Sequence, residues 1–172
     1  MKALALFGMF VLATAFIGCS HPISQGLRDT LDPALTFDVL NKEAKLHLGS
    51  RVMLGGEIVE TRILNEGSEI ELVQKDLDCL GYPETGDSSQ GRYIFKSSKF
   101  LEPQIYSKGR RITGVGTIRA SHTGKVGEAA YDFPVIELEE LHLWEEYSAP
   151  VNPYLDPFYY PSYRSPFLYR TW

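Results

Sequence analysis

Hydrophobic and polar residues alternate along much of the chain after residue 50, which is the spacing expected of β-strands with one buried face. At residues 69–73, for example, two apolar side chains, Ile70 and Leu72, alternate with glutamates. Other runs in this half of the chain are rich in β-branched and apolar residues, which favour strands as well. We therefore predict five strands, at residues 52–59, 69–73, 92–96, 111–119 and 131–144.

Glycine, proline and polar turn residues separate and bend these strands. Gly55 and Gly56 interrupt the first run, and glycine inside a strand is typical of a bulge or a bend. Residues 65–67 predict the turn of a hairpin between the first two strands, and residues 123–125 predict the turn before the last strand. Pro134 indicates an edge or a bulge in the last strand, because proline donates no ladder hydrogen bond.

A segment before the strands has helical spacing instead. Apolar residues three and four apart from Phe37 to Leu48 predict two or three helical turns, with Thr36 as N-cap and Gly49 as the stop. Five strands, the first long and bent, favour a mainly β fold, namely a small five-stranded OB-like Greek-key barrel with a short N-terminal helix. A β-sandwich is the alternative fold.

The chain begins with a different pattern. Lys2 is followed by an uncharged stretch and then by Cys19, which predicts a lipoprotein signal peptide cleaved between Gly18 and Cys19. Acyl chains such as palmitate on Cys19 would then hold the protein to a membrane. A plain cleavable signal ending at residues 13–15 is one alternative. A transmembrane helix is disfavoured, because sixteen helical residues reach only about 24 Å of a hydrocarbon core about 30 Å thick.

These patterns divide the chain into four segments. The second has no apolar periodicity and predicts a tether, and the fourth is so rich in proline and aromatic residues that it predicts an extended or disordered tail. The segments are a signal peptide at residues 1–18, a lipidated tether at 19–33, a β-barrel domain at 34–147 and the tail at 148–172.

Charge restricts the partners. The chain has 17 basic and 22 acidic residues, and removal of residues 1–18 takes away Lys2 and moves the formal net charge from −5 to −6. An acidic protein of this kind does not attract nucleic acid or anionic lipid by its net charge. We therefore predict attachment to the membrane through the lipid on Cys19, no nucleic acid, and a protein or glycan partner in the cell envelope.

Several short motifs along the chain together resemble those of the Slp family of outer-membrane lipoproteins, named for a starvation-inducible member. The motifs are Gly49-Ser50-Arg51-Val52 with Gly55-Gly56-Glu57-Ile58, Gly91-Arg92-Tyr93, Phe100-Leu101-Glu102-Pro103 with Tyr106, Gly109-Arg110-Arg111-Ile112-Thr113 with Gly116, Gly127-Glu128 with Tyr131 and Pro134-Val135, and Leu141-His142-Leu143-Trp144. The resemblance implies a periplasm-facing lipoprotein of the outer membrane, related to stress or starvation and without an established reaction. Ser20 after the cysteine agrees with outer-membrane sorting.

Candidate chemistry in the remaining residues is sparse. The spacing of the four histidines matches no metal motif, so we predict no metal or other cofactor. Cys79 is interpreted as a buried small hydrophobic residue, although a reactive or metal-binding thiol is an alternative. Asp76, Asp78 and Asp87 could bind calcium only weakly, since EF-hand spacing is missing. A cluster of carboxylates is interpreted as a solvated face, at Glu137, Glu139, Glu140, Glu145 and Glu146.

Three hypotheses for function follow. The first is a non-catalytic structural or interaction role in the envelope, with no enzymatic activity. The second is an OB-type binding module for an oligosaccharide or another envelope ligand, and it requires Tyr93, Phe95 and Tyr106 to be exposed together as a ligand face. The third is a hydrolase that uses two of the clustered glutamates, which would have to converge in a cleft.

Overall fold

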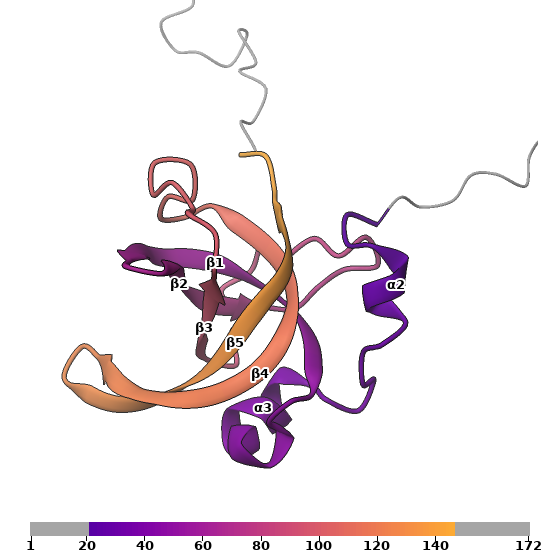
Figure 1. The fold of residues 1–172 in the computed structure, drawn as a ribbon, viewed down its shortest axis with the longest axis horizontal. Helices are drawn as coiled ribbons and strands as arrows, with labels where there is room; N and C mark the ends of the chain where they lie inside the picture. The colour runs from indigo at the N-terminus through magenta and orange to yellow at the C-terminus, as the bar shows by residue number, and fades with distance from the viewer. Residues whose placement is uncertain (1–20, 147–172) are drawn as a thin grey trace, which may run out of the picture.

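The computed structural model describes residues 21–146. The predicted signal peptide with Gly18 and Cys19, and the predicted tail at 148–172, lie outside the described residues. Five strands dominate the described part, and two short helices and a 3-10 turn precede them (Figure 1). The elements are α2 (Gln25–Arg28), α3 (Phe37–Glu43), η2 (Ala44–His47), β1 (Arg51–Leu64), β2 (Gly67–Lys75), β3 (Arg92–Ser97), β4 (Arg111–Val126) and β5 (Ala129–Leu143).

The five strands close into a barrel in the order β1-β2-β3-β5-β4. Neighbouring strands run antiparallel except β3 and β5, which pair in parallel from Ile94 with Val135 to Lys96 with Glu137. β1 serves two neighbours, since its first half pairs with β4 and its second half with β2. This topology confirms the predicted five-stranded OB-like barrel and excludes the β-sandwich.

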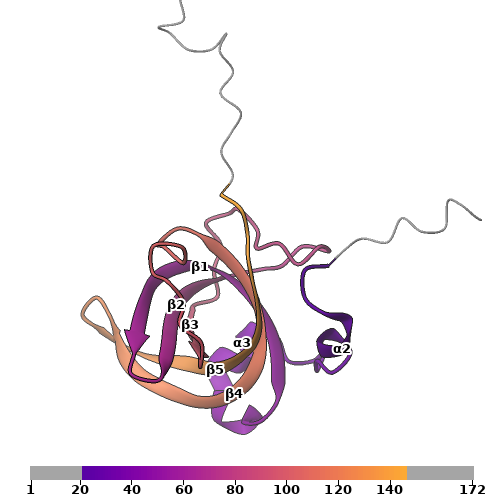
Figure 2. The same ribbon diagram turned by 45° about the horizontal axis from the view of Figure 1, so that its top comes forward.

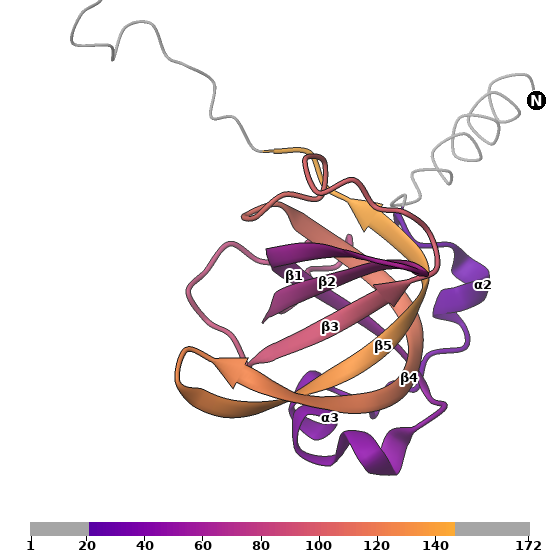
Figure 3. The same cartoon turned by 60° about the vertical axis from the view of Figure 1, so that its left-hand side comes forward.

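The apolar core fills the barrel and continues under α3. Ile70 and Leu72 are fully buried, as their alternation predicted, and Phe37 and Leu40 of α3 join the same cluster. Figure 3 shows α3 across one end of the barrel. The helix occupies the predicted place, with Thr36 as N-cap and Gly49 in a left-handed conformation after it.

Glycine allows two strands to approach closely in the barrel wall. A Cβ on Gly116 would overlap the backbone oxygen of Glu137 on the neighbouring strand β5, and a Cβ on Gly56 would stand 2.6 Å from the backbone oxygen of Val73 on β2. No side chain fits at either place. The irregularity predicted at Gly55 and Gly56 lies further along β1: both glycines pair in regular register, and the register shifts between Ile58 and Glu60.

The last hairpin is longer than its turn residues predicted. Thr123 and Gly124 continue the β4–β5 ladder opposite Asp132 and Tyr131, and the chain reverses only at Gly127, whose φ is +60°. The predicted turn at residues 123–125 is therefore wrong. The extra pairs are held because Phe133 and Val135, with Ile94 of β3, form a second apolar cluster along the hairpin.

Two further expectations are corrected by the structure. Cys79 is exposed, since it lies in the polar loop between β2 and β3 rather than on a strand. Residues 21–33 do not form a free tether in their described part: Ile23 is 1% exposed, and α2 lies alongside the barrel (Figure 3). The folded unit therefore begins well before residue 34.

Candidate functional site

The predicted ligand face of three aromatic rings is not on the surface. Tyr93 and Phe95 are both 0% exposed and stack edge to face inside the barrel, with ring centroids 5.0 Å apart. Tyr106 is half-buried and packs against the same core cluster. The alternation of β3 points the two rings inward, so this face cannot hold an oligosaccharide.

The hydroxyl of Tyr93 has no hydrogen-bond partner among the described residues. Burial raises the pKa of Tyr93 well above its ordinary value, so the hydroxyl keeps its proton. It stands against Gly56, where a Cβ would lie 3.1 Å from the Tyr93 oxygen. The ring therefore contributes packing to the core, and the hydroxyl is an isolated polar group within it.

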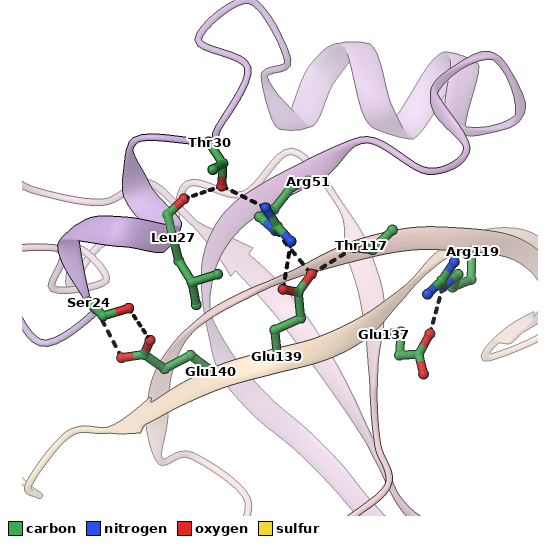
Figure 4. A network of polar contacts seen from close by, with 9 residues as sticks. All are labelled: Ser24, Leu27, Thr30, Arg51, Thr117, Arg119, Glu137, Glu139 and Glu140. Carbon is green, nitrogen blue, oxygen red and sulfur yellow. Dashed lines mark hydrogen bonds and ion pairs between the residues drawn. The ribbon is translucent and has the colours of Figure 1, made fainter.

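The clustered glutamates of β5 point to different partners rather than into one cleft. Figure 4 shows Glu137 and Glu139 bound to arginines and Glu140 bound to the N-terminal segment. The Glu137 carboxylate accepts a hydrogen bond of 2.6 Å from Arg119. The side chains of Glu137 and Glu139 both lie on the outside of the barrel. The convergence that a two-carboxylate hydrolase requires is not found for these three glutamates.

Glu139 is the centre of the most extensive of these contacts. Arg51 donates two hydrogen bonds to its carboxylate, of 3.0 and 2.9 Å, and Thr117 donates a third of 2.7 Å. The hydrogen bonds from Arg51 and Thr117 lower the pKa of Glu139. Arg51 also donates to the hydroxyl of Thr30, so this carboxylate joins β1, β4 and β5 to the N-terminal segment (Figure 4).

A cleft of about 580 Å³ opens at the end of the barrel where β4 begins and β5 ends. Its walls come from the β2–β3 loop, from the start of β4 and from the last described residues of the chain. The lining residues are Tyr82, Thr85, Gly109, Arg110, Arg111, Glu145 and Glu146. Charges of both signs therefore face one concave surface.

Two adjacent arginines form the basic side of this cleft. Arg110 donates hydrogen bonds to the backbone oxygens of Trp144, at 2.8 Å, and Ile105, at 3.3 Å. Arg111 donates to the hydroxyl of Tyr82 at 2.7 Å, and its guanidinium carbon lies 5.6 Å from the centre of that ring. Among residues 21–146, neither guanidinium forms an ion pair with a carboxylate.

A short relay of contacts holds the cleft in shape. The indole N–H of Trp144 donates to the hydroxyl of Thr113 at 2.9 Å, and that hydroxyl donates to the backbone oxygen of Gly81 at 2.6 Å. The rings of Tyr82 and Trp144 meet edge to face with centroids 4.9 Å apart. The β2–β3 loop is thereby fixed to β4 and to the end of β5, so the cleft is preformed.

The sequence contained part of the signal for this cleft. Arg110, Arg111 and Trp144 all lie in motifs that carry the family resemblance, yet nothing in their spacing brings them to Tyr82. Tyr82 belongs to a loop without periodicity, and only the closed barrel shows that this loop crosses the start of β4. The site is assembled by the pairing of distant segments, and a single sequence does not show which segments pair.

A second groove, of about 660 Å³, lies at the β1–β2 turn. It is lined by the turn itself together with polar residues of β3, β4 and β5, among them Lys96, Arg119 and Glu137. The outer surface of the neighbouring strands carries ion pairs, Arg62 with Glu69 and Arg92 with Glu71.

The described part offers neither a grouped set of metal ligands nor a membrane-spanning helix. Within residues 21–146, no three His, Cys, Asp or Glu side chains are grouped so as to hold a metal ion. In the same range, no helix has both the length and the apolar character needed to cross a membrane.

The comparison with protein families decides the classification. The family model of the outer membrane lipoprotein Slp family matches residues 16–172. The chain belongs to this family. The match confirms the resemblance drawn from the sequence motifs, and it identifies the protein as a lipoprotein of the outer membrane, the predicted localisation.

Relatives among known proteins agree with that classification. The chain is 28% identical over 73% of its length to the Escherichia coli (strain K12) "Uncharacterized lipoprotein YeaY", of which the match covers 65%, just under two thirds. It is 23% identical over 80% of its length to "Outer membrane protein Slp" of the same strain, covering 74% of that protein. A Haemophilus influenzae "Uncharacterized protein" is 32% identical over 54% of the chain and is covered to 51%.

Several solved structures are similar at a low level. They include the mitochondrial single-stranded DNA binding protein Rim1 of S. cerevisiae, at 15% identity, a TM-score of 0.35 and coverage of 58% of this chain and 99% of that one. The yobA protein of Bacillus subtilis is 15% identical with a TM-score of 0.31, covering 56% of this chain and 97% of that one. TM-scores of this size say nothing about what this chain binds.

Proposed function

We propose that this protein is a lipid-anchored lipoprotein that presents its barrel to the periplasm and has a non-catalytic interaction role in the cell envelope. In this proposal residues 1–18 are removed as a signal peptide, and Cys19 carries the lipid. The family and the predicted lipoprotein motif support the anchor. The role is related to starvation or stress, as the family resemblance implies.

The observation that carries the interaction role is the preformed cleft at Tyr82, Arg110 and Arg111. A guanidinium recognises carboxylates through paired N–H donors, and Glu145 and Glu146, which line the same cleft, suit a cationic group. Peptide chains carry both kinds of group at close spacing. We therefore propose that the cleft binds a peptide segment of an envelope protein.

Site-specific photocrosslinking in intact cells tests this proposal. A photoreactive amino acid replaces Thr85, which lines the cleft, and in a second strain it replaces Glu128, at the turn between β4 and β5. We expect a discrete crosslinked product from position 85 and none of the same mass from position 128.

Two arginine variants make the crosslinking specific. Arg111→Ala removes the cleft guanidinium and is expected to reduce the product at position 85 at least fivefold, whereas Arg62→Ala removes an exposed arginine of β1 and leaves it unchanged. Equal amounts of product in the two variants, or equal products from both probe positions, would contradict a peptide site in the cleft.

The alternative, an OB-type module for an oligosaccharide, depends on the groove at the β1–β2 turn, because loops of this kind take part in ligand binding by OB folds. Calorimetric titration of the protein with envelope oligosaccharides separates the two proposals. Binding that is lost in Arg119→Ala and kept in Arg111→Ala would favour the oligosaccharide module over the peptide cleft.

A further inference from the structure

We propose that the end of the barrel where His21 meets the β2–β3 loop at Gly81 faces the surface of the lipid bilayer. This inference rests on the proposed function, since it takes Cys19 as the lipidated residue. It goes further because it fixes which face of the barrel meets the lipid.

The N-terminal segment is fastened to the barrel immediately after the anchor position. Ile23 is buried, and the backbone N–H and hydroxyl of Ser24 donate to the carboxylate of Glu140 at 2.9 and 2.7 Å. The guanidinium of Arg28 donates back to the oxygen of Ile23 at 3.1 Å. Figure 4 shows Ser24 and Glu140 reaching each other between this segment and β5.

His21 fixes the start of the described chain to the β2–β3 loop. Its ring lies so close to Gly81, whose φ is +79°, that a Cβ there would overlap the imidazole. The backbone N–H of Ile23 donates to the ring nitrogen of His21 at 3.1 Å. Burial, followed by the charge of Arg28, lowers the pKa of His21 and favours the neutral ring that accepts this bond.

The distance from the anchor to this contact is short. Cys19 stands two positions before His21, and an extended chain covers at most about 3.6 Å per residue, so the lipidated residue stands within about 7 Å of His21. A flexible tether of fourteen residues would allow about 20 Å. Because the segment is packed rather than free, the barrel is held at the bilayer with one end toward it.

The features of that end suit a lipid surface. Leu80, adjacent to Gly81, is 41% exposed, and it lies at the loop that His21 contacts. Figure 2 shows the β2–β3 loop between the places where the described chain begins and ends. The aromatic-rich residues 148–172 follow from this same end, and tyrosine and tryptophan favour the headgroup region.

Net charge is not what attaches this end to the bilayer. The mature chain carries a formal net charge of −6, so attraction to anionic lipid is not the source of attachment. Acyl chains supply the affinity at about 0.8 kcal/mol per buried methylene. The packed N-terminal segment supplies the orientation, because it connects those chains to one end of the barrel.

Fluorescence quenching in vesicles tests the orientation on the full lipidated protein. Cys79 is exposed in the β2–β3 loop and is the remaining thiol once Cys19 is acylated, so it takes a thiol-reactive fluorophore without mutation. The matched control is Cys79→Ser with Glu128→Cys, which moves the fluorophore to the distant tip of the β4–β5 hairpin (Figure 3). The vesicles contain phosphatidylethanolamine, phosphatidylglycerol and a lipid with a spin-labelled headgroup.

We expect quenching at position 79 to exceed that at position 128 at least threefold. An insertion of about twelve Gly and Ser residues between Ser20 and His21 lengthens the link by about 20 Å, and we expect it to remove most of the difference. Equal quenching at both positions, or a difference that survives the insertion, would overturn the inference.

Flotation of the same vesicles separates the two proposals. Protein that floats with the lipid but shows equal quenching at both positions retains its anchor and contradicts only the orientation. Protein that does not float lacks the anchor, and this result overturns the proposed function together with the orientation that depends on it.

Discussion

Replacement of Ile23 by alanine is the most informative perturbation of the N-terminal segment. The side chain is 1% exposed, and it belongs to neither of the two apolar clusters of the barrel. Its burial therefore stabilises the packing of residues 21–33 against the barrel rather than the barrel itself. Ile23→Ala removes three carbon groups at about 0.8 kcal/mol each, so the loss is about 2.4 kcal/mol.

Hydrogen exchange measures this loss where it occurs. The amides of Arg28, Asp29, Thr30 and Leu31 donate within the segment and are protected only while its short helical turns are formed. Since 1.4 kcal/mol corresponds to a tenfold change in an opening equilibrium, a loss of about 2.4 kcal/mol raises the exchange rates of these amides roughly 50-fold. The exchange rates cannot exceed those of the same amides in an unfolded chain.

A surface variant provides the control. Leu46→Ala removes an apolar side chain that is 76% exposed, and it should change the exchange of residues 28–31 less than twofold. The circular dichroism spectrum of Ile23→Ala should retain the strand signal of the barrel. If the four amides exchange in Ile23→Ala as slowly as in the unaltered protein, Ile23 does not hold the segment, and the argument for a short, rigid link to the membrane is refuted.

Three further changes test the barrel wall and its polar groups. Tyr93→Phe removes a buried hydroxyl that lacks a partner among the described residues, so the free energy of unfolding in urea should stay the same or rise by about 1 kcal/mol. A clear decrease in this free energy would show that the hydroxyl is hydrogen-bonded. Gly116→Ala places a methyl against the backbone of Glu137 and should lower the same quantity by about 1–3 kcal/mol, while Gly26→Ala, in open space, should not. The pKa of Glu139 lies below its ordinary 4.5, so the stability that this carboxylate contributes is present above the unfolded pKa and is lost as the pH falls through the folded pKa. The difference in unfolding free energy between the protein and Glu139→Gln should therefore be largest near pH 7 and shrink below about pH 4. A difference independent of pH would contradict the hydrogen bonds from Arg51.

Local patterns in the sequence were enough for most of the barrel. Alternation located Ile70 and Leu72 in the core, and glycine within the first run indicated an irregular first strand, although its register shift lies after Ile58. These features depend on the nearest neighbours in the chain, because side-chain direction in a strand has a period of two. The number of strands and their bend-forming glycines also favoured a closed barrel of the OB type, which the structure confirms.

Features that depend on distant segments could not be predicted. The polar residues at 123–125 have turn chemistry, but Phe133 and Val135 pack beside Ile94 and extend the hairpin to Gly127. Alternation placed Tyr93 and Phe95 on one strand without showing which face was inside. The segment at 21–33 looked like a tether because its one deeply buried residue, Ile23, has no periodic neighbours.

The candidate cleft also combines residues that the sequence motifs contain with contacts that only the fold brings together. Arg110 and Arg111 belong to one of the motifs that carry the family resemblance, whereas the contact of Arg111 with Tyr82 joins residues 29 positions apart. That contact exists because the β2–β3 loop crosses the start of β4, where Thr113 holds the backbone of Gly81. Sequence alone supplied the parts, and the closed barrel supplied their arrangement.

The attachment of lipid to Cys19 is the claim on which both proposals rest, and mass spectrometry of the protein isolated from membranes tests it most directly. Trypsin cleaves after lysine and arginine, and Arg28 is the first of these after Lys2, so one peptide spans residues 19–28. We predict that this peptide begins at Cys19 and carries a diacylglyceryl thioether together with an acylated amino terminus. A peptide with a free thiol at Cys19, or one that begins upstream near residue 16, would contradict the account.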